Sequence, residues 1–273
     1  MTPIVHNIDP FLIQFTEGFG IRWYSLPYML GMLFVYLSLR GAARSGEIRN
    51  LTPEVAESFV LAAILAALIG ARFFHVFVFE YSRYGLNPLA WIAVWRGGLA
   101  FHGGLAGVLV VIVWFTRKHG LTLYRFTDQL AIPIALALAF GRIANFINAE
   151  MYGTPYEGTF CVDYSQNEHM ANPPAGCRHP TQLYESAKNF GMAGLFWATR
   201  RWFPPPPGVI TWGFFAYYGW IRFGLMYLRV EERVWAGLTL SQIFSAGMGV
   251  LGVVMIAVVV IRRSGTDREA SPA

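Results

Sequence analysis

The chain has 273 residues, of which 55% are hydrophobic and only 14% are charged, and its formal net charge is +5 at pH 7. Soluble domains carry about a quarter charged residues, so this composition excludes an ordinary soluble domain and indicates a polytopic membrane protein. The sequence lacks the alternating segments of about ten residues that are typical of a transmembrane β-barrel. The expected fold class is therefore an all-α integral membrane protein.

Several apolar runs reach the roughly 20 residues that a helix needs to cross a hydrocarbon core of about 30 Å. We expect seven membrane spans. They are placed at 20–39, 55–79, 99–116, 128–147, 184–202, 209–228 and 239–261. The whole chain, 1–273, is then a single polytopic membrane domain that ends in a tail at 262–273.

The basic residues indicate the direction of these spans. Short connections rich in Lys and Arg lie on the cytoplasmic side of a membrane. Three alternate connections and the tail carry such residues, namely Arg40, Arg44, Arg49, Arg117, Lys118, Arg125, Arg200, Arg201, Arg262, Arg263 and Arg268. The sequence therefore predicts an N-terminus outside the cytoplasm and a C-terminus inside it.

The connection at 148–183 is long and polar, and it falls on the opposite side of the membrane. We expect a small extracytoplasmic loop region there. Both cysteines of the chain, Cys161 and Cys177, lie in this connection. On the oxidising side of a bacterial membrane two such thiols are able to form a disulfide. They are equally able to stay reduced, because the sequence does not give the distance between them.

Ionisable residues inside a span indicate a structural or functional role, because placing one at the bilayer centre costs at least about 2.5–3.5 kcal/mol. Arg72 and His75 lie close to the end of a span and are interpreted as interfacial anchors that reach water. His102 lies in the glycine-rich stretch "GGLAFHGGLAGV", 97–108. Glycines spaced four residues apart fit a helix-packing pattern, whereas a histidine takes a proton near neutral pH. His102 is therefore either structural or a general base.

The stretch "FGRIANFINAEMYG", 140–153, places three polar residues on one edge of a helix that is about to end. Arg142, Asn145 and Asn148 recur at a spacing of three, and Glu150 follows them. Such an edge is either a seam of hydrogen bonds between helices or the wall of a cavity. Because this edge contains the charged residue Arg142, we favour the interpretation as a cavity wall.

Arg222, near the end of the sixth expected span, falls on the same leaflet as Arg142. A guanidinium is always charged and offers a fork of donors that matches phosphate oxygens. Two such groups at one membrane depth suit a phospholipid headgroup. The alternative is that each arginine pairs with a nearby acid or with the carbonyl groups at a helix end.

At these residues the sequence resembles the prolipoprotein diacylglyceryl transferases, the bacterial membrane enzymes that begin lipoprotein maturation. The stretch "GRIANFINAEMYG", 141–153, is similar to the signature of that family. Other segments match in the same order, namely "IRWYSLPY" at 21–28, "FHGGLAG" at 101–107, Asp128, "RHPTQLYES" at 178–186, "YYGWIRF" at 217–223 and "LTLSQIFS" at 238–245. The likeness covers nearly the whole chain.

The resemblance implies a multi-pass enzyme of the bacterial cytoplasmic (inner) membrane. It implies transfer of the diacylglyceryl group of phosphatidylglycerol to the thiol of the lipobox cysteine in a preprolipoprotein, with release of glycerol 1-phosphate. No cofactor and no nucleic acid partner are implied. No metal is expected either, because the histidines show no ligand spacing with acids or cysteines.

The resemblance also implies roles for individual residues. The expected catalytic residues are His102, Arg142 and Arg222. The residues expected to hold phosphatidylglycerol are Arg142, Tyr24, Asn145, Asn148, Glu150 and Gly153. Secondary candidates are Asp128, Glu185, Tyr218 and Arg229.

One position departs from the family pattern. Four residues after Arg222 the family has a glutamate, and this chain has Met226. Arg222 is therefore expected to lack its usual partner, with Glu231 or Glu232 as substitutes. The departure leaves an inactive, lipid-binding relative as an alternative. An anion or lipid transporter is a further alternative, although the paired broken helices in two matching halves that it requires are not visible in the sequence.

Overall fold

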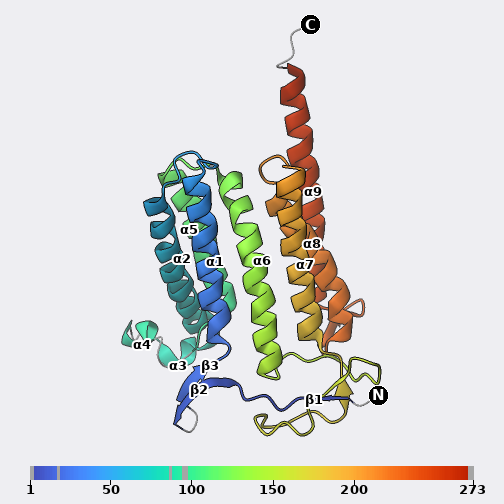
Figure 1. Cartoon of the computed structure of the whole chain (residues 1–273). Coiled ribbons are helices and arrows are strands. Elements are labelled where there is room, and N and C mark those ends of the chain that lie inside the picture. Colours follow the sequence, from blue (N-terminus) through green and yellow to red (C-terminus); the bar gives the residue numbers. More distant parts are fainter. Residues whose placement is uncertain (1–2, 17–18, 86–87, 94–97, 270–273) are drawn as a thin grey trace. The chain divides into compact units, whose positions relative to one another are not determined.

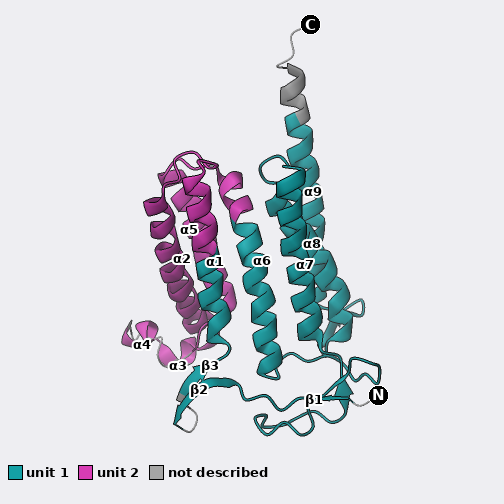
Figure 2. Cartoon of the chain, viewed as in Figure 1, with its two compact units in different colours: residues 1–34, 130–273 teal, residues 35–129 magenta. Residues whose placement is uncertain are grey.

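The computed structural model describes residues 3–16, 19–85, 88–93 and 98–269 and is mostly helical (Figure 1). The chain divides into two compact units (Figure 2). Unit 1 consists of residues 1–34 and 130–273, and unit 2 of residues 35–129. Each unit is described by itself below.

Within the described ranges, five helices are long and apolar enough to cross a membrane. They are α1 (Ser25–Arg44), α2 (Pro53–Phe74) with the π-helical turn His75–Phe79 that continues it, α5 (Phe101–Lys118), α6 (Leu123–Ile147) and α9 (Leu240–Glu269). Their length and composition confirm a helical membrane protein.

Two further helices occupy the remaining predicted ranges, namely α7 (Thr181–Trp202) and α8 (Val209–Leu225). Neither is among the five helices that are both long and apolar enough, α7 because it is less apolar and α8 because it is too short. Helix α7 carries Glu185 and Lys188 on its inner face, both of them buried. Helix α8 has only 17 residues. The less apolar character of α7 thus comes in part from charged side chains that are packed inside the protein.

The first helix begins later than the sequence predicts. Residues before Ser25 form an antiparallel hairpin of β2 (Phe11–Thr16) and β3 (Phe19–Arg22). The prediction of a helix from residue 20 is therefore wrong at its start, because hydropathy does not distinguish an apolar strand from the first turns of an apolar helix.

At the C-terminal end of the chain, α9 continues beyond the predicted end at 261 to Glu269. Residues 270–273 of the predicted tail lie outside the described residues.

In unit 2, helices α2 and α5 approach each other closely through small residues. A Cβ atom added to Gly103 would collide with the backbone carbonyl of Gly70, and one added to Gly107 would collide with that of Ala66. Glycine is needed at these positions because the two backbones are in contact. The glycines around His102 thus serve helix packing.

Arg72 of α2 is 2% exposed, so the prediction that it reaches water is wrong. Its Nε donates to the carbonyl of Trp91 at 3.2 Å, and its Nη1 donates to the carbonyl of Gly98 at 3.2 Å. The connection to α5 contains the short helices α3 (Tyr81–Tyr84) and α4 (Pro88–Ile92), and Trp91 lies within α4 while Gly98 follows it. Arg72 fixes this connection because the backbone carbonyls satisfy its charged donors.

In unit 1, the connection between α6 and α7 is tied to the N-terminus by a small sheet. Strand β1 (Ile4–Val5) pairs in parallel with β4 (Val162–Asp163), which pairs antiparallel with β5 (Cys177–Arg178). Cys161 and Cys177 form a disulfide with their Cα atoms 5.3 Å apart. The disulfide and the sheet hold the predicted loop region together.

A second contact of the N-terminus is made by His6, which is 1% exposed. Its Nε2 lies 2.8 Å from the carbonyl oxygen of Phe146, and its Nδ1 lies 2.8 Å from Nδ2 of Asn167. The Asn167 Oδ1 accepts from the backbone N–H of His169, so its amide N–H₂ faces the ring. The histidine is therefore neutral with its proton on Nε2.

Acidification is expected to destabilise this contact. Burial lowers the pKa of His6 below its usual value, so the unfolded chain takes up the proton first as the pH falls. The stabilisation is complete above about pH 6.5 and is lost as the pH falls from there through the lower pKa of the folded state. Melting temperatures in detergent between about pH 7.5 and pH 5 should fall more steeply for the wild type than for His6→Gln. Parallel curves for the two proteins would contradict the assignment.

Candidate active site

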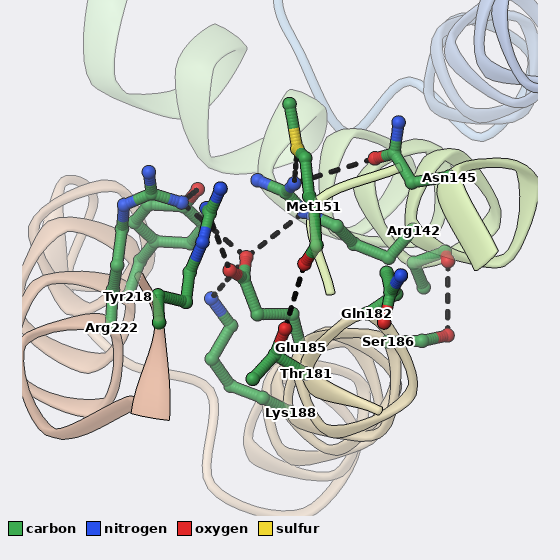
Figure 3. Close-up of polar contacts among 12 residues, drawn as sticks. Arg142, Asn145, Met151, Thr181, Gln182, Glu185, Ser186, Lys188, Tyr218 and Arg222 are labelled. Carbon is green, nitrogen blue, oxygen red and sulfur yellow. Dashed lines mark hydrogen bonds and ion pairs between the residues drawn. The ribbon is translucent and has the colours of Figure 1, made fainter. Parts of the chain in front are cut away.

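The carboxylate of Glu185 lies at the centre of four cationic side chains in unit 1 (Figure 3). Arg142 Nε lies 2.9 Å and Arg222 Nη1 3.3 Å from its Oε2. Lys188 Nζ lies 3.9 Å from the same oxygen, and Arg229 Nη1 lies 3.8 Å from Oε1. We call these five residues the cationic cluster. Glu185 is 2% exposed, so its charge requires these partners.

Four segments bring the cluster together. Arg142 lies near the end of α6, and Glu185 and Lys188 lie one turn apart on α7. Arg222 lies in the last turn of α8, where a cation also interacts favourably with the helix dipole. Arg229 follows the short 3-10 helix Met226–Leu228. The residues are distant in the sequence and are joined by the packing of α6, α7 and α8.

The cluster has an excess of positive charge. Four cations face one buried carboxylate, and Arg229 has a second acidic neighbour in Glu231 at 3.8 Å. Like charges gathered in a poorly hydrated region repel one another unless an anion balances them. The arrangement is therefore suited to binding an anionic group.

A chain of hydrogen bonds extends from Arg142 along the predicted polar edge. Arg142 Nη1 donates to Oδ1 of Asn145 at 3.4 Å, and Asn145 Nδ2 donates to Oε2 of Glu150 at 3.1 Å (Figure 3 shows the first of these). The backbone carbonyl of Glu150 accepts from Nε2 of Gln182 on α7 at 2.6 Å. These contacts fix the amide of Asn145 beside the guanidinium of Arg142.

Two other members of the signature have different surroundings. The Oδ1 atom of Asn148 is buried and has no hydrogen-bond partner among the described residues. Gly153 donates its backbone N–H to the carbonyl of His179 at 2.9 Å. A Cβ atom at this position would lie 2.5 Å from the carbonyl oxygen of Leu228. Glycine at 153 is thus required by the close approach of another backbone segment.

Arg222 has an acidic partner although Met226 replaces the expected glutamate, and its ion pair is with Glu185 instead of the predicted Glu231 or Glu232. Its Nη1 contacts Glu185, and the same atom donates to the hydroxyl of Tyr218 at 3.3 Å. Met226 is 1% exposed and packs in the interior. The acid comes from α7 instead of from the next turn of α8, and the predicted substitute Glu231 pairs with Arg229. The sequence spacing within one helix did not show this partner.

The remaining predicted residues lie outside the cluster. His102 and Asp128 belong to unit 2, and the side chain of His102 is exposed on α5, with its ring centre 6.1 Å from that of Phe74. Tyr24 in unit 1 lies just before α1, and its ring contacts that of Tyr28 at 5.5 Å between centres. The prediction missed Lys188, whose one signal in the sequence is its spacing of three from Glu185 on α7.

Comparison with known proteins agrees with the resemblance noted in the sequence. The family model described as prolipoprotein diacylglyceryl transferase matches residues 10–258, a range that contains the whole cationic cluster. The phosphatidylglycerol–prolipoprotein diacylglyceryl transferase of Bordetella avium is 34% identical over 253 residues, covering 90% of this chain and 92% of that protein. The proteins of the same name from Neisseria gonorrhoeae and Vibrio cholerae are 33% and 32% identical, each over 92% of this chain and 95% and 91% of their own lengths. With matches this complete across both units, the chain belongs to the prolipoprotein diacylglyceryl transferase family.

Proposed function

We propose that this protein transfers the diacylglyceryl group of phosphatidylglycerol to the thiol of the lipobox cysteine in a preprolipoprotein. A carbon–sulfur bond forms, the bond between the glycerol carbon and the phosphate oxygen breaks, and glycerol 1-phosphate leaves with the electron pair of that bond. The observation that carries the proposal is the cationic cluster, in which four cationic side chains surround a single carboxylate.

The phosphate of the lipid is proposed to bind Arg142 and Arg222. Besides Glu185, the contacts of Arg142 are weak, since its Nη1 lies 3.4 Å from an amide oxygen and 3.0 Å from the thioether sulfur of Met151. A phosphate oxygen is a stronger acceptor than either of these atoms and suits the guanidinium fork. Negative charge on the leaving oxygen would then develop next to fixed positive charge, which lowers the barrier.

The other signature residues are proposed to orient the lipid and to accept the thiol proton. Asn145, Asn148 and Tyr24 supply hydrogen bonds to the headgroup, and Glu150 holds Asn145 in place. The buried Oδ1 of Asn148, which has no partner in the part of the chain that the structure describes, supports a polar partner on the lipid. His102 is proposed as the general base, since the thiolate and not the thiol is the nucleophile.

We further propose that α7 and α8 complete a seven-span protein of the bacterial cytoplasmic membrane. Buried charges on α7 explain its low hydropathy without placing those charges in lipid. The basic connections then lie in the cytoplasm, and the N-terminus and the loop region with its disulfide lie outside it. Together these elements form one membrane domain with an extracytoplasmic loop region.

The proposal is tested with detergent-purified protein, phosphatidylglycerol and a peptide that contains a lipobox cysteine. We expect release of glycerol phosphate together with an equal amount of lipidated peptide. A peptide with Cys→Ser should give no release, because an alcohol is a far weaker nucleophile than a thiolate. Binding of phosphatidylglycerol without turnover would instead identify an inactive, lipid-binding relative.

A further inference from the structure

Within the cationic cluster, the side chain of Lys188 makes no hydrogen bond to the described residues. The residue is 6% exposed, and its Nζ is buried without a hydrogen-bond partner. The ammonium group lies 3.9 Å from Oε2 of Glu185 and 3.9 Å from the centre of the Tyr218 ring. A buried ammonium normally satisfies its three donors. This one is held by charge and by the face of an aromatic ring alone.

Lipid binding would leave the carboxylate of Glu185 with fewer cationic partners. Arg142 and Arg222 are the two closest cations to Oε2, at 2.9 and 3.3 Å. If both arginines turn toward a phosphate, this oxygen loses its two nearest cationic contacts. Arg229 would remain 3.8 Å from Oε1, but Oε2 would lose its ion pairs. A buried carboxylate oxygen that loses its partners is destabilising, so the exchange would be unfavourable unless another cation took their place.

We propose that Lys188 is the reserve counter-ion of Glu185, an inference that rests on the proposed binding of phosphatidylglycerol by this site. When the phosphate engages Arg142 and Arg222, the ammonium of Lys188 moves from 3.9 Å into hydrogen-bond distance of the freed carboxylate. Lys188 does not touch the lipid. It is a positioning residue that makes the exchange of partners by the arginines favourable.

Two features of the site favour this role. Lys188 lies one turn after Glu185 on the same helix, so a rotation of its flexible side chain suffices to reach Oε2. Tyr218 separates the two cations, because its hydroxyl accepts from Arg222 while its ring faces Lys188. The ring keeps the ammonium in the cluster before lipid binds without supplying an anion that would compete with Glu185.

The first test measures binding of phosphatidylglycerol, diluted into phosphatidylcholine micelles, to purified full-length protein. Lys188→Met keeps the length and the packing against Tyr218 but removes the charge. We expect its dissociation constant for phosphatidylglycerol to rise about tenfold, with kcat at saturating lipid changed less than about threefold. The matched control is Lys118→Met, since Lys118 and Lys188 are the two lysines of the chain and Lys118 is exposed on α5. This control should bind like the wild type.

The second test asks whether Lys188 acts through Glu185. In a Glu185→Gln background the side chain is neutral and needs no counter-ion, so adding Lys188→Met should change the dissociation constant less than about twofold. A lysine that only filled space would give the same loss in both backgrounds, and that result would overturn the inference. If Lys188→Met does not fold, Lys188→Arg and Lys188→Gln replace it, with the arginine variant expected to bind more tightly than the glutamine variant.

The outcomes separate this inference from the proposed function. Wild-type protein that binds phosphatidylglycerol no better than phosphatidylcholine would refute the proposed lipid site itself. Wild-type protein that binds selectively, together with a Lys188→Met variant of equal affinity, would refute the counter-ion role alone.

Discussion

Replacing Arg142 by alanine is expected to lower kcat/KM for phosphatidylglycerol by at least about a hundredfold, the usual effect of removing one donor that stabilises a developing anion. Arg142 makes the shortest contact in the cationic cluster and connects it to Asn145. Its loss removes a hydrogen-bond donor to the phosphate and frees the amide oxygen of Asn145 from its contact with Arg142. The measurement is the initial rate of glycerol phosphate release with a lipobox peptide.

Arg142→Lys distinguishes charge from geometry. Lysine keeps the positive charge but lacks the planar fork, so its activity should fall between those of the wild type and the alanine variant. The matched control is Arg233→Ala, which removes an exposed arginine of unit 1 that donates to the carbonyl of Gly237. This control should leave the rate unchanged. Wild-type rates in Arg142→Ala would show that the headgroup binds elsewhere.

Hydropathy predicted the positions of the helices well, because the bilayer fixes both their length and their composition. Helix α6 ends at Ile147, as expected, and α5 is displaced by two residues from the predicted range 99–116. The hairpin before α1 was missed because β3 overlaps the start of the predicted span and its pairing with β2 has no hydropathy signal. A sequence gives the apolar length of a segment but not the pairing that converts part of it into strands.

The contacts among the candidate site residues were predictable where those residues lie close together in the sequence. Arg142, Asn145 and Glu150 form a hydrogen-bonded chain because α6 and the turn after it place them side by side. Glu185 was only a secondary candidate, since nothing in its own segment shows that cations from α6 and α8 converge on it. Such partners are determined by the tertiary packing of the helices. They cannot be predicted from the spacing of residues along one helix.

Replacing Glu185 by alanine is expected to destabilise the protein by about 3–5 kcal/mol, the usual cost of breaking a buried ion pair from one side. Four cationic side chains would lose the carboxylate that now separates their charges, and their repulsion would act in a poorly hydrated region. The measurement is unfolding in mixed micelles of a mild detergent and SDS. The exposed acid Glu168 provides the control, since Glu168→Ala should change the free energy of unfolding by less than about 0.5 kcal/mol.

Glu185→Gln separates the charge of this side chain from its shape. The amide keeps an acceptor oxygen for Arg142 and Arg222, so the variant should fold but be less stable than the wild type. Added phosphatidylglycerol should stabilise Glu185→Ala more than the wild type, because the phosphate supplies the negative charge that the variant lacks. Equal stabilisation of both proteins by the lipid would mean that the phosphate does not enter the cationic cluster. That result would contradict the site even if Glu185→Ala were as unstable as expected.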